Sequence, residues 1–132
     1  MAMLIGELAE RSGISARTIR FYEQMKVLTA PERSSNRYRV YSDRTLAELT
    51  FIKRAQRLGF SLDEIRDILA LGRSGRLPCN RVTTLCAVHI GEIDRQMAEL
   101  IAFRKLLETA RRKANAGCRL TREGFCNAIM GL

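Results

Sequence analysis

Two cysteines near the end of the sequence have a spacing that suits the binding of one metal ion. Cys118 and Cys126 flank the seven residues RLTREGF. A loop of that length is able to fold back and bring two thiolates to one ion, at about 2.3 Å each. Sulfur donors select thiophilic ions such as Cu(I), Zn(II), Hg(II), Cd(II) and Pb(II). Two thiolates alone suit a linear site for a monovalent ion, whereas a third thiolate favours a divalent ion.

Cys79 is the best candidate for that third ligand. It begins a segment, residues 79–116, that contains no proline and has Gly91 as its one glycine. A single helix is the economical interpretation, and at about 1.5 Å per residue it would be on the order of 55 Å long. If two such helices pair antiparallel, the start of one meets the end of the other. Cys79 would then join Cys118 across a dimer interface.

An apolar stripe along this segment predicts that the helix pairs with a second helix. The stripe consists of Cys79, Thr83, Cys86, Ile90, Ile93, Met97, Leu100 and Leu107, at intervals that are mostly three or four residues. A lone helix of this length cannot bury such a stripe against a small domain. A two-helix coiled coil in a homodimer is the plain solution.

Three residues of this helix have simpler interpretations than metal binding. Cys86 lies on the apolar stripe, where a free cysteine commonly acts as a small hydrophobe, although metal ligation and redox chemistry stay open for it. His89 is the only histidine and lies far along the helix from the tail, so a packing or capping role is favoured. Met97 is interpreted as a core residue.

The tail cysteines also allow a redox alternative. Arg119 and Arg122 lie near Cys118 in the sequence, and we expect them to lower its thiol pKa and raise its reactivity. The tail lacks the close cysteine cluster of an iron–sulfur site. In a reducing compartment, metal ligation and thiol chemistry are both favoured over structural disulfides.

Two short helices joined by a glycine turn are predicted near the N-terminus. Apolar residues from Ile5 to Ile14 have helical spacing around Ser12-Gly13, where the glycine supplies the turn. Ser15 is expected to cap a second helix, Ala16 to Lys26. This is the helix-turn-helix pattern.

A wing and two more helices are predicted next. A polar break precedes the alternating run Arg37 to Tyr41, which indicates a short strand. Ser42-Asp43 is expected to cap a third helix that runs to about Leu58. The capping box from Ser61 to Glu64 opens a fourth helix, which runs to about Leu71.

The charge of the chain points to an anionic partner. Lys and Arg outnumber Asp and Glu by 23 to 14, which gives a formal net charge of +9. Such a balance favours nucleic acid or an acidic membrane surface. The basic helix ISARTIRFYEQMKVL and the Arg/Tyr ribbon NRYRVY offer two separate surfaces suited to polyphosphate, which favours duplex DNA.

Other classes of protein are disfavoured. No window approaches the roughly 20 apolar residues that a membrane span needs, and acidic residues interrupt the N-terminal segment where a signal peptide has an apolar core. We therefore expect a cytoplasmic protein with no membrane partner. One histidine, no Gly-rich phosphate loop and no nucleophile–base pair argue against an enzyme.

The segments IGELAERSGISARTIRFYEQMKVL and NRYRVYSDRTLAELTFIKRAQRLGFSLDEI closely resemble the N-terminal domain of the MerR family of transcriptional regulators. The match runs from Ile5 to about Leu71. The long helix followed by cysteines in a short tail resembles the metal-sensing branch. The resemblance implies a homodimer that binds an unusually spaced promoter and, on effector binding, distorts the DNA so that RNA polymerase can use it.

The resemblance also implies which residues contact DNA. They are Arg17, Thr18, Arg20 and Tyr22 on the second helix, and Arg37, Tyr38 and Arg39 on the wing. Tyr22 resembles the family tyrosine that reaches the phosphate backbone. The alternative is a solvated basic face with Tyr22 and Tyr38 half in the core.

For the effector, the resemblance implies a divalent ion. Divalent-ion sensors of this branch have cysteine at the position of Cys79, whereas monovalent-ion sensors have serine. Hg, Zn, Cd or Pb is therefore favoured, with Cu(I) as the alternative. The chain departs from the family pattern at Asn127, where proline usually follows the last cysteine. Its helix between Cys79 and Cys118 is also longer by about one turn, which would move the loop by about 5 Å.

The predicted fold is therefore mainly α and has three parts. Residues 1–75 form a winged helix-turn-helix DNA-binding domain. Residues 76–116 form a long dimerisation helix that pairs as an antiparallel coiled coil. Residues 117–132 form a short metal-binding loop and tail.

Overall fold

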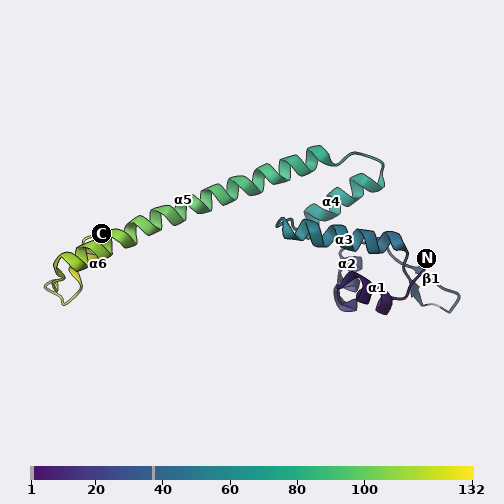
Figure 1. Ribbon diagram of the computed structural model, residues 1–132, viewed down its shortest axis with the longest axis horizontal. Coiled ribbons are helices and arrows are strands. Elements are labelled where there is room, and N and C mark those ends of the chain that lie inside the picture. The colour runs from purple at the N-terminus through teal and green to yellow at the C-terminus, as the bar shows by residue number, and fades with distance from the viewer. Residues whose placement is uncertain (1, 37) are drawn as a thin grey trace. The chain divides into compact units, whose positions relative to one another are not determined.

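The computed structural model describes residues 2–36 and 38–132 (Figure 1). The predicted DNA contact at Arg37 therefore lies outside the described residues. The chain divides into two compact units, Met1–Cys86 and Ala87–Leu132. This division by packing falls inside the long helix, whereas the functional division at residues 75 and 116 stays a prediction. In the described part, no helix has both the length and the apolar character needed to cross a membrane.

The first unit begins with the predicted helix-turn-helix. Helix α1 (Ile5–Ser12) ends at Gly13, whose φ of 71° lets its N–H bond back to the Ala9 carbonyl. Helix α2 (Ala16–Gln24) starts at Ser15, whose hydroxyl oxygen accepts a hydrogen bond from the Thr18 N–H at 3.2 Å. Both the turn and the cap were expected, because each is made within a few residues of the chain.

Helix α2 ends two residues earlier than expected. The cause is Lys26, which has a φ of 61° in the left-handed region and so cannot continue a right-handed helix. The N–H of Val27 then bonds to the Tyr22 carbonyl at 2.9 Å, which closes the helix end. The chain leaves α2 with Val27 fully buried.

A small antiparallel hairpin follows and is called the wing (residues 32–40). Strands β1 (Glu32–Arg33) and β2 (Arg39–Val40) have two residues each. Strand β2 ends one residue before the end of the predicted strand, because Tyr41 leaves the hairpin and pairs with Met3 instead. The N–H of each of these two residues donates to the carbonyl of the other at 2.8 Å. The N-terminal segment therefore holds the base of the wing.

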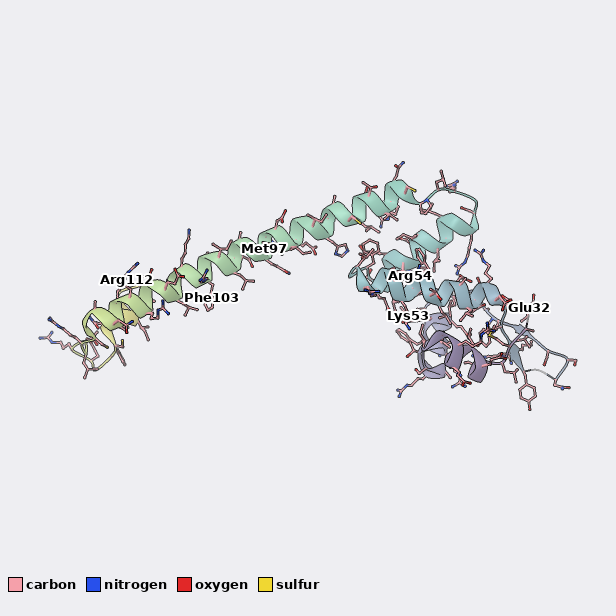
Figure 2. All side chains as sticks on the ribbon, in the orientation of Figure 1. Glu32, Lys53, Arg54, Met97, Phe103 and Arg112 are labelled. Carbon is pink, nitrogen blue, oxygen red and sulfur yellow. The ribbon has the colours of Figure 1, made fainter. Side chains whose placement is uncertain are left out.

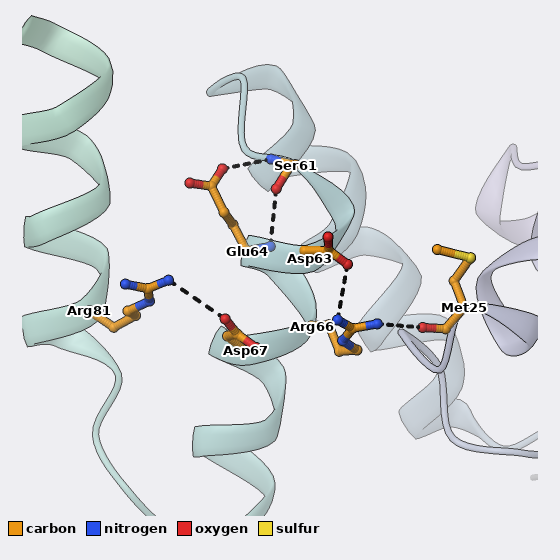
Figure 3. A network of polar contacts seen from close by, with 7 residues as sticks. All are labelled: Met25, Ser61, Asp63, Glu64, Arg66, Asp67 and Arg81. Carbon is orange, nitrogen blue, oxygen red and sulfur yellow. Dashed lines mark hydrogen bonds and ion pairs between the residues drawn. The ribbon is translucent and has the colours of Figure 1, made fainter. Parts of the chain in front are cut away.

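Helices α3 (Asp43–Arg57) and α4 (Leu62–Arg73) complete the domain. Both hydrogen bonds of the predicted capping box are present at α4, where Ser61 and Glu64 bond to each other's backbone N–H (Figure 3). Ser42 occupies the cap position of α3, but its side chain makes no capping hydrogen bond.

One apolar core joins these helices. Helix α1 packs against α2 and α3, and α3 packs against α4. The largest fully buried side chains among the described residues are Leu8, Ile19, Val27, Tyr41, Leu49, Ile52 and Ile65. The first turns of helix α5 (Cys79–Gly117) also belong to this core, because Leu85 is buried in it and Cys86 is half-buried against it. This placement suits Cys86 as a small apolar side chain.

A buried ion pair ties α4 to the rest of the unit. The Glu48 side chain on α3 is 7% exposed and pairs with the guanidinium of Arg73 at the end of α4. Arg73 also donates to the Val27 carbonyl at 2.9 Å. The end of α4 is therefore fastened both to α3 and to the segment that follows α2.

The second unit contains the rest of α5 and a short helix, α6 (Asn127–Met130). Helix α5 has 39 residues and ends at Gly117, one residue later than expected, where φ is 141°. Ala128 of α6 is buried, and Lys113 on α5 donates to the Gly131 carbonyl at 2.7 Å. The tail is thus folded back on the end of α5.

Candidate nucleic-acid interface and thiol pair

Two arginines of α2 are presented to solvent, as predicted. Arg17 and Arg20 are exposed, whereas Ile19 between them is fully buried and anchors the helix. Thr18 is half-buried, and its hydroxyl oxygen accepts a hydrogen bond from the Ser15 hydroxyl at 2.9 Å. The arginines are therefore free of the core, while Thr18 takes part in the cap of the helix.

Tyr22 is more deeply buried than is expected for a residue that contacts DNA. It is only 6% exposed, and its hydroxyl donates to Gln56 Oε1 on α3 at 3.4 Å. Its ring belongs to the core, more completely than the half-buried alternative supposed. A contact between Tyr22 and phosphate would have to be made by the hydroxyl.

The wing places its two described candidates differently. Tyr38 is 64% exposed. Arg39 is half-buried, and its Nη1 lies 3.0 Å from Glu23 Oε2. Arg20, Tyr38 and Arg39 line a hollow of about 610 Å³ together with the start of α1. Side chains from α2 and the wing therefore border the same space.

Glu23 is a site residue that sequence reasoning missed. Its side chain is 9% exposed, and besides Arg39 it accepts a hydrogen bond from the Tyr41 hydroxyl. Burial, together with this hydrogen bond to Glu23, raises the pKa of Tyr41 to about 12. The available signal was one carboxylate within the basic segment IRFYEQMK.

The predicted pair of tail cysteines is brought together. The Sγ atoms of Cys118 and Cys126 are 3.4 Å apart, and we call these residues the thiol pair. Cys118 is exposed and Cys126 is partly exposed. A turn closed by Gly124, with a φ of 88°, and a bridge between Leu120 and Cys126 fold the loop back. Two sulfur donors therefore lie close together and open to solvent.

The electrostatics of the thiol pair differ from the expectation for Cys118. The pKa of Cys126 is lowered, because its sulfur is hydrogen-bonded to Cys118 and then to the backbone N–H groups of Ile129 and Ala128. The pKa of Cys118 is raised by the same thiol contact. The predicted lowering of the Cys118 pKa by Arg119 and Arg122 is therefore wrong, because the contact with Cys126, followed by burial, raises this pKa instead.

Asn127 is a second residue that was not assigned a role. Its N–H donates to the Arg119 carbonyl at 3.0 Å, and its Oδ1 accepts from the Arg119 N–H at 2.8 Å. These two bonds close the tail loop (residues 118–127), and each joins the two residues that directly follow Cys118 and Cys126. A proline at this position could not donate the first of them.

The third candidate metal ligand is Cys79. Cys79 is exposed at the start of α5 and belongs to the first unit, whereas the thiol pair belongs to the second. Across residues 2–36 and 38–132, no three His, Cys, Asp or Glu side chains are grouped so that they could hold one metal ion.

Known proteins of the same architecture identify the family. Residues 3–71 match the MerR HTH family of regulatory proteins, and residues 46–110 match the family described as MerR, DNA binding. The mercuric resistance operon regulatory protein of Bacillus cereus is 36% identical over 107 residues, which are 81% of each protein.

Two solved structures are similar over most of their length. A transcription regulator from Ralstonia metallidurans in complex with lead(II) has a TM-score of 0.73 and 36% identity, and the match covers 91% of both chains. HiNmlR, a MerR family regulator that lacks the sensor domain and is bound to promoter DNA, has a TM-score of 0.58 and 28% identity, covering 88% of this chain and 90% of the other. The chain therefore belongs to the MerR family of helix-turn-helix transcriptional regulators.

Proposed function

We propose that the chain is a metal-responsive regulator that binds promoter DNA as a homodimer and activates transcription when a thiophilic ion binds the thiol pair. The observation that carries this proposal is the 3.4 Å separation of the Cys118 and Cys126 sulfurs in a folded, solvent-accessible loop. The mercury-resistance relative and the lead-bound structural neighbour support a metal as the signal.

The thiol pair offers two sulfur donors, which fit a thiophilic cation. Two thiolates alone suit a monovalent ion, whereas a third thiolate from Cys79 would favour a divalent one. Hg, Zn, Cd or Pb is therefore favoured, with Cu(I) as the alternative.

We assign the third ligand to Cys79 of the partner chain. Cys79 is exposed at the start of α5, and the thiol pair follows the end of the same helix. Antiparallel pairing of two α5 helices brings one helix start to the other helix end, so each pair would receive Cys79 from the opposite chain. This arrangement would make the metal a bridge between subunits.

Apolar side chains left exposed on α5 support the dimer. In the single chain, Ile90, Ile93, Met97, Leu100 and Leu107 are 53–66% exposed. Ile101 and Phe103 flank this stripe and are also exposed, and Met97 and Phe103 are labelled along the helix in Figure 2. A contiguous exposed apolar surface of this kind marks a protein interface.

For DNA, we propose that α2 is the recognition helix and that α2 and the wing contact the duplex together. Arg17 and Arg20 are exposed for base or phosphate contacts, with Thr18 beside them in the first turn. Tyr38 and Arg39 would contact the backbone from the wing, and Tyr22 would do so through its hydroxyl. Arg37 keeps its assignment from the family resemblance. Most such contacts position the protein and do not read the sequence.

Helix α4 is suited to connect the long helix α5 to the DNA-binding helix α2. Arg81 on α5 lies 3.6 Å from Asp67 on α4, and Arg66 on α4 donates to the Met25 carbonyl at the end of α2 at 3.1 Å (Figure 3). A shift of α5 would thus reach the recognition helix and alter the promoter for RNA polymerase. The ion must favour one dimer geometry, since equal affinity for both would shift nothing.

The test is an anaerobic titration of the reduced protein with a panel of these ions, read together with promoter output. We expect one ion per thiol pair, and loss of induction with retained DNA binding in Cys118→Ser/Cys126→Ser. Cys86→Ala is the matched control and should keep induction. Retained induction in the double variant would reject the proposed site.

A mixed dimer tests the origin of the third ligand. One chain carries Cys79→Ser, and its partner carries Cys118→Ser/Cys126→Ser. If Cys79 acts across the interface, this heterodimer keeps one intact three-cysteine site and binds one divalent ion tightly. If Cys79 acts within its own chain, no intact site remains and tight binding disappears.

The short sulfur separation also favours a second candidate, a thiol-based redox sensor. With hydrogen peroxide as oxidant, the two thiols would lose two protons and two electrons to form one S–S bond, and the peroxide would be reduced to two waters. Activation of the promoter by peroxide in metal-free protein, without activation by any metal, would select this candidate over the first.

A further inference from the structure

Glu23 connects the recognition helix to the wing. It lies in the last turn of α2 with its side chain 9% exposed, and its two carboxylate oxygens have different partners. Oε2 accepts a hydrogen bond from Arg39 Nη1 at 3.0 Å, and Oε1 accepts one from the Tyr41 hydroxyl. Both partners lie on or directly after β2, so a single side chain spans the two elements.

The wing needs support of this kind. Its strands have two residues each, and an isolated two-stranded hairpin is at best marginally stable in water. The backbone bonds between Tyr41 and Met3 fasten the base of the wing to the N-terminal segment, not to α2. The Glu23 carboxylate supplies a connection to the recognition helix itself.

The bond to Glu23 places Arg39 at the edge of the proposed DNA-binding surface. Its side chain is 38% exposed, and it lines the hollow of about 610 Å³ with Arg20 and Tyr38. A guanidinium has five N–H donors, so one that bonds a carboxylate retains others for a phosphate oxygen. Arg39 is thus able to face a duplex while it remains bound to Glu23.

We propose that Glu23 is a positioning residue for DNA binding, whose carboxylate holds Arg39 and Tyr41 so that α2 and the wing grip the phosphate backbone as one surface. This inference rests on the proposed DNA contacts of α2 and the wing. According to this inference, the Glu23 carboxylate increases DNA affinity, although DNA itself repels a negative charge.

The direction in which one mutation changes DNA affinity distinguishes a positioning role from a simple charge effect. Neutralising a carboxylate near DNA strengthens binding if charge alone matters, because phosphate repulsion is removed. If Glu23 positions Arg39, the same change weakens binding despite the gain in positive charge. Glu23→Gln keeps the shape of the side chain and removes its charge, so it tests the two cases directly.

The experiment uses the full-length chain and a fluorescein-labelled duplex that the wild-type protein selects from a random-sequence library. Anisotropy titrations at several salt concentrations give affinity and its salt slope. We expect Glu23→Gln to bind about tenfold more weakly, because a charge-assisted hydrogen bond is lost. The magnitude of the salt slope should fall by about one, as one phosphate contact is lost.

Two controls accompany this variant. Glu10→Gln removes an exposed carboxylate from α1 and should not weaken binding. In an Arg39→Gln background, Glu23→Gln should cause little further loss, since its effect runs through Arg39. A full tenfold loss in that background, or wild-type affinity for Glu23→Gln with an unchanged unfolding midpoint, would overturn the proposal.

A separate variant distinguishes this inference from the DNA surface on which it rests. If Arg20→Gln weakens binding and Glu23→Gln does not, only the role of Glu23 is rejected. If neither variant weakens binding, the surface itself is wrong. Should Glu23→Gln fail to fold, Arg39→Lys decides the question, because lysine keeps the charge but lacks the planar fork. Positioning predicts weaker binding for Arg39→Lys, and a pure charge effect predicts wild-type binding.

Discussion

Asn127 and Arg119 form a reciprocal pair of hydrogen bonds at the base of the tail loop. The Asn127 N–H donates to the Arg119 carbonyl at 3.0 Å, and the Arg119 N–H donates to Asn127 Oδ1 at 2.8 Å. Each residue directly follows one cysteine of the thiol pair. The bonds therefore hold the two sulfurs near one another before any ion arrives, which reduces the ordering that binding would otherwise require.

The first prediction concerns this preorganisation. Asn127→Ala removes the side-chain acceptor and keeps the backbone bond. With about 1 kcal/mol lost for one hydrogen bond, affinity for a divalent thiophilic ion should fall about fivefold. Competition with a chelator of known affinity measures the change. Asn115→Ala, at an exposed position of α5, is the control, and equal affinities for the two variants would contradict the assigned role.

The second prediction concerns the buried ion pair of α3 and α4. Arg73→Met leaves the buried Glu48 carboxylate without its charged partner, so the free energy of unfolding should fall by about 3 kcal/mol. Urea unfolding at a fixed protein concentration measures this. Arg76→Met changes an exposed arginine near the same helix end and should have a small effect.

Replacement of both partners should be milder than loss of one. Glu48→Leu/Arg73→Met removes the stranded charge, so it should recover part of the stability that Arg73→Met loses. If the double variant has a lower free energy of unfolding than Arg73→Met, the pair stabilises the fold by more than the mutual neutralisation of its two charges.

The third prediction is a dependence of stability on alkaline pH. The folded-state pKa of Tyr41 is raised from 10.0 to about 12, chiefly by burial, so folding favours the neutral phenol. This contribution is complete below pH 10 and is lost as pH rises through about 12. Tyr41→Phe should cost about 1 kcal/mol at neutral pH, through the lost bond to Glu23, and the difference should shrink above pH 10.

Unfolding free energies at a series of pH values check this behaviour. Tyr38→Phe removes an exposed phenol and serves as the control. A constant difference between wild type and Tyr41→Phe up to pH 12 would contradict the raised pKa.

The fourth prediction concerns the apolar face of α5. Leu100 is 66% exposed in the single chain, and an aspartate there would be buried unpaired in the proposed dimer. Leu100→Asp should therefore shift the protein to monomer in sedimentation equilibrium. Ala102→Asp places the same charge about 200° around the helix and should stay dimeric. A dimeric Leu100→Asp protein would exclude this face as the interface.

Several elements of this protein are determined by the sequence alone. The turn at Gly13, the cap at Ser15 and the capping box of Ser61 and Glu64 were all predictable, because each uses bonds between residues no more than four apart. The family also followed from the order of these motifs. Helix α5 was predictable within one residue, since no proline interrupts it.

The tertiary structure decided which polar residues face inward and which sulfurs meet. Tyr22 is buried because α2 packs its ring into the core, and Glu23 reaches Arg39 and Tyr41 across 16 and 18 residues. Likewise, the tail fold sets the 3.4 Å sulfur contact and with it the opposite pKa shifts of Cys118 and Cys126. Periodicity and local hydrogen bonding are encoded within a few residues. The direction of a side chain and the charge beside it depend on elements packed together from distant parts of the chain.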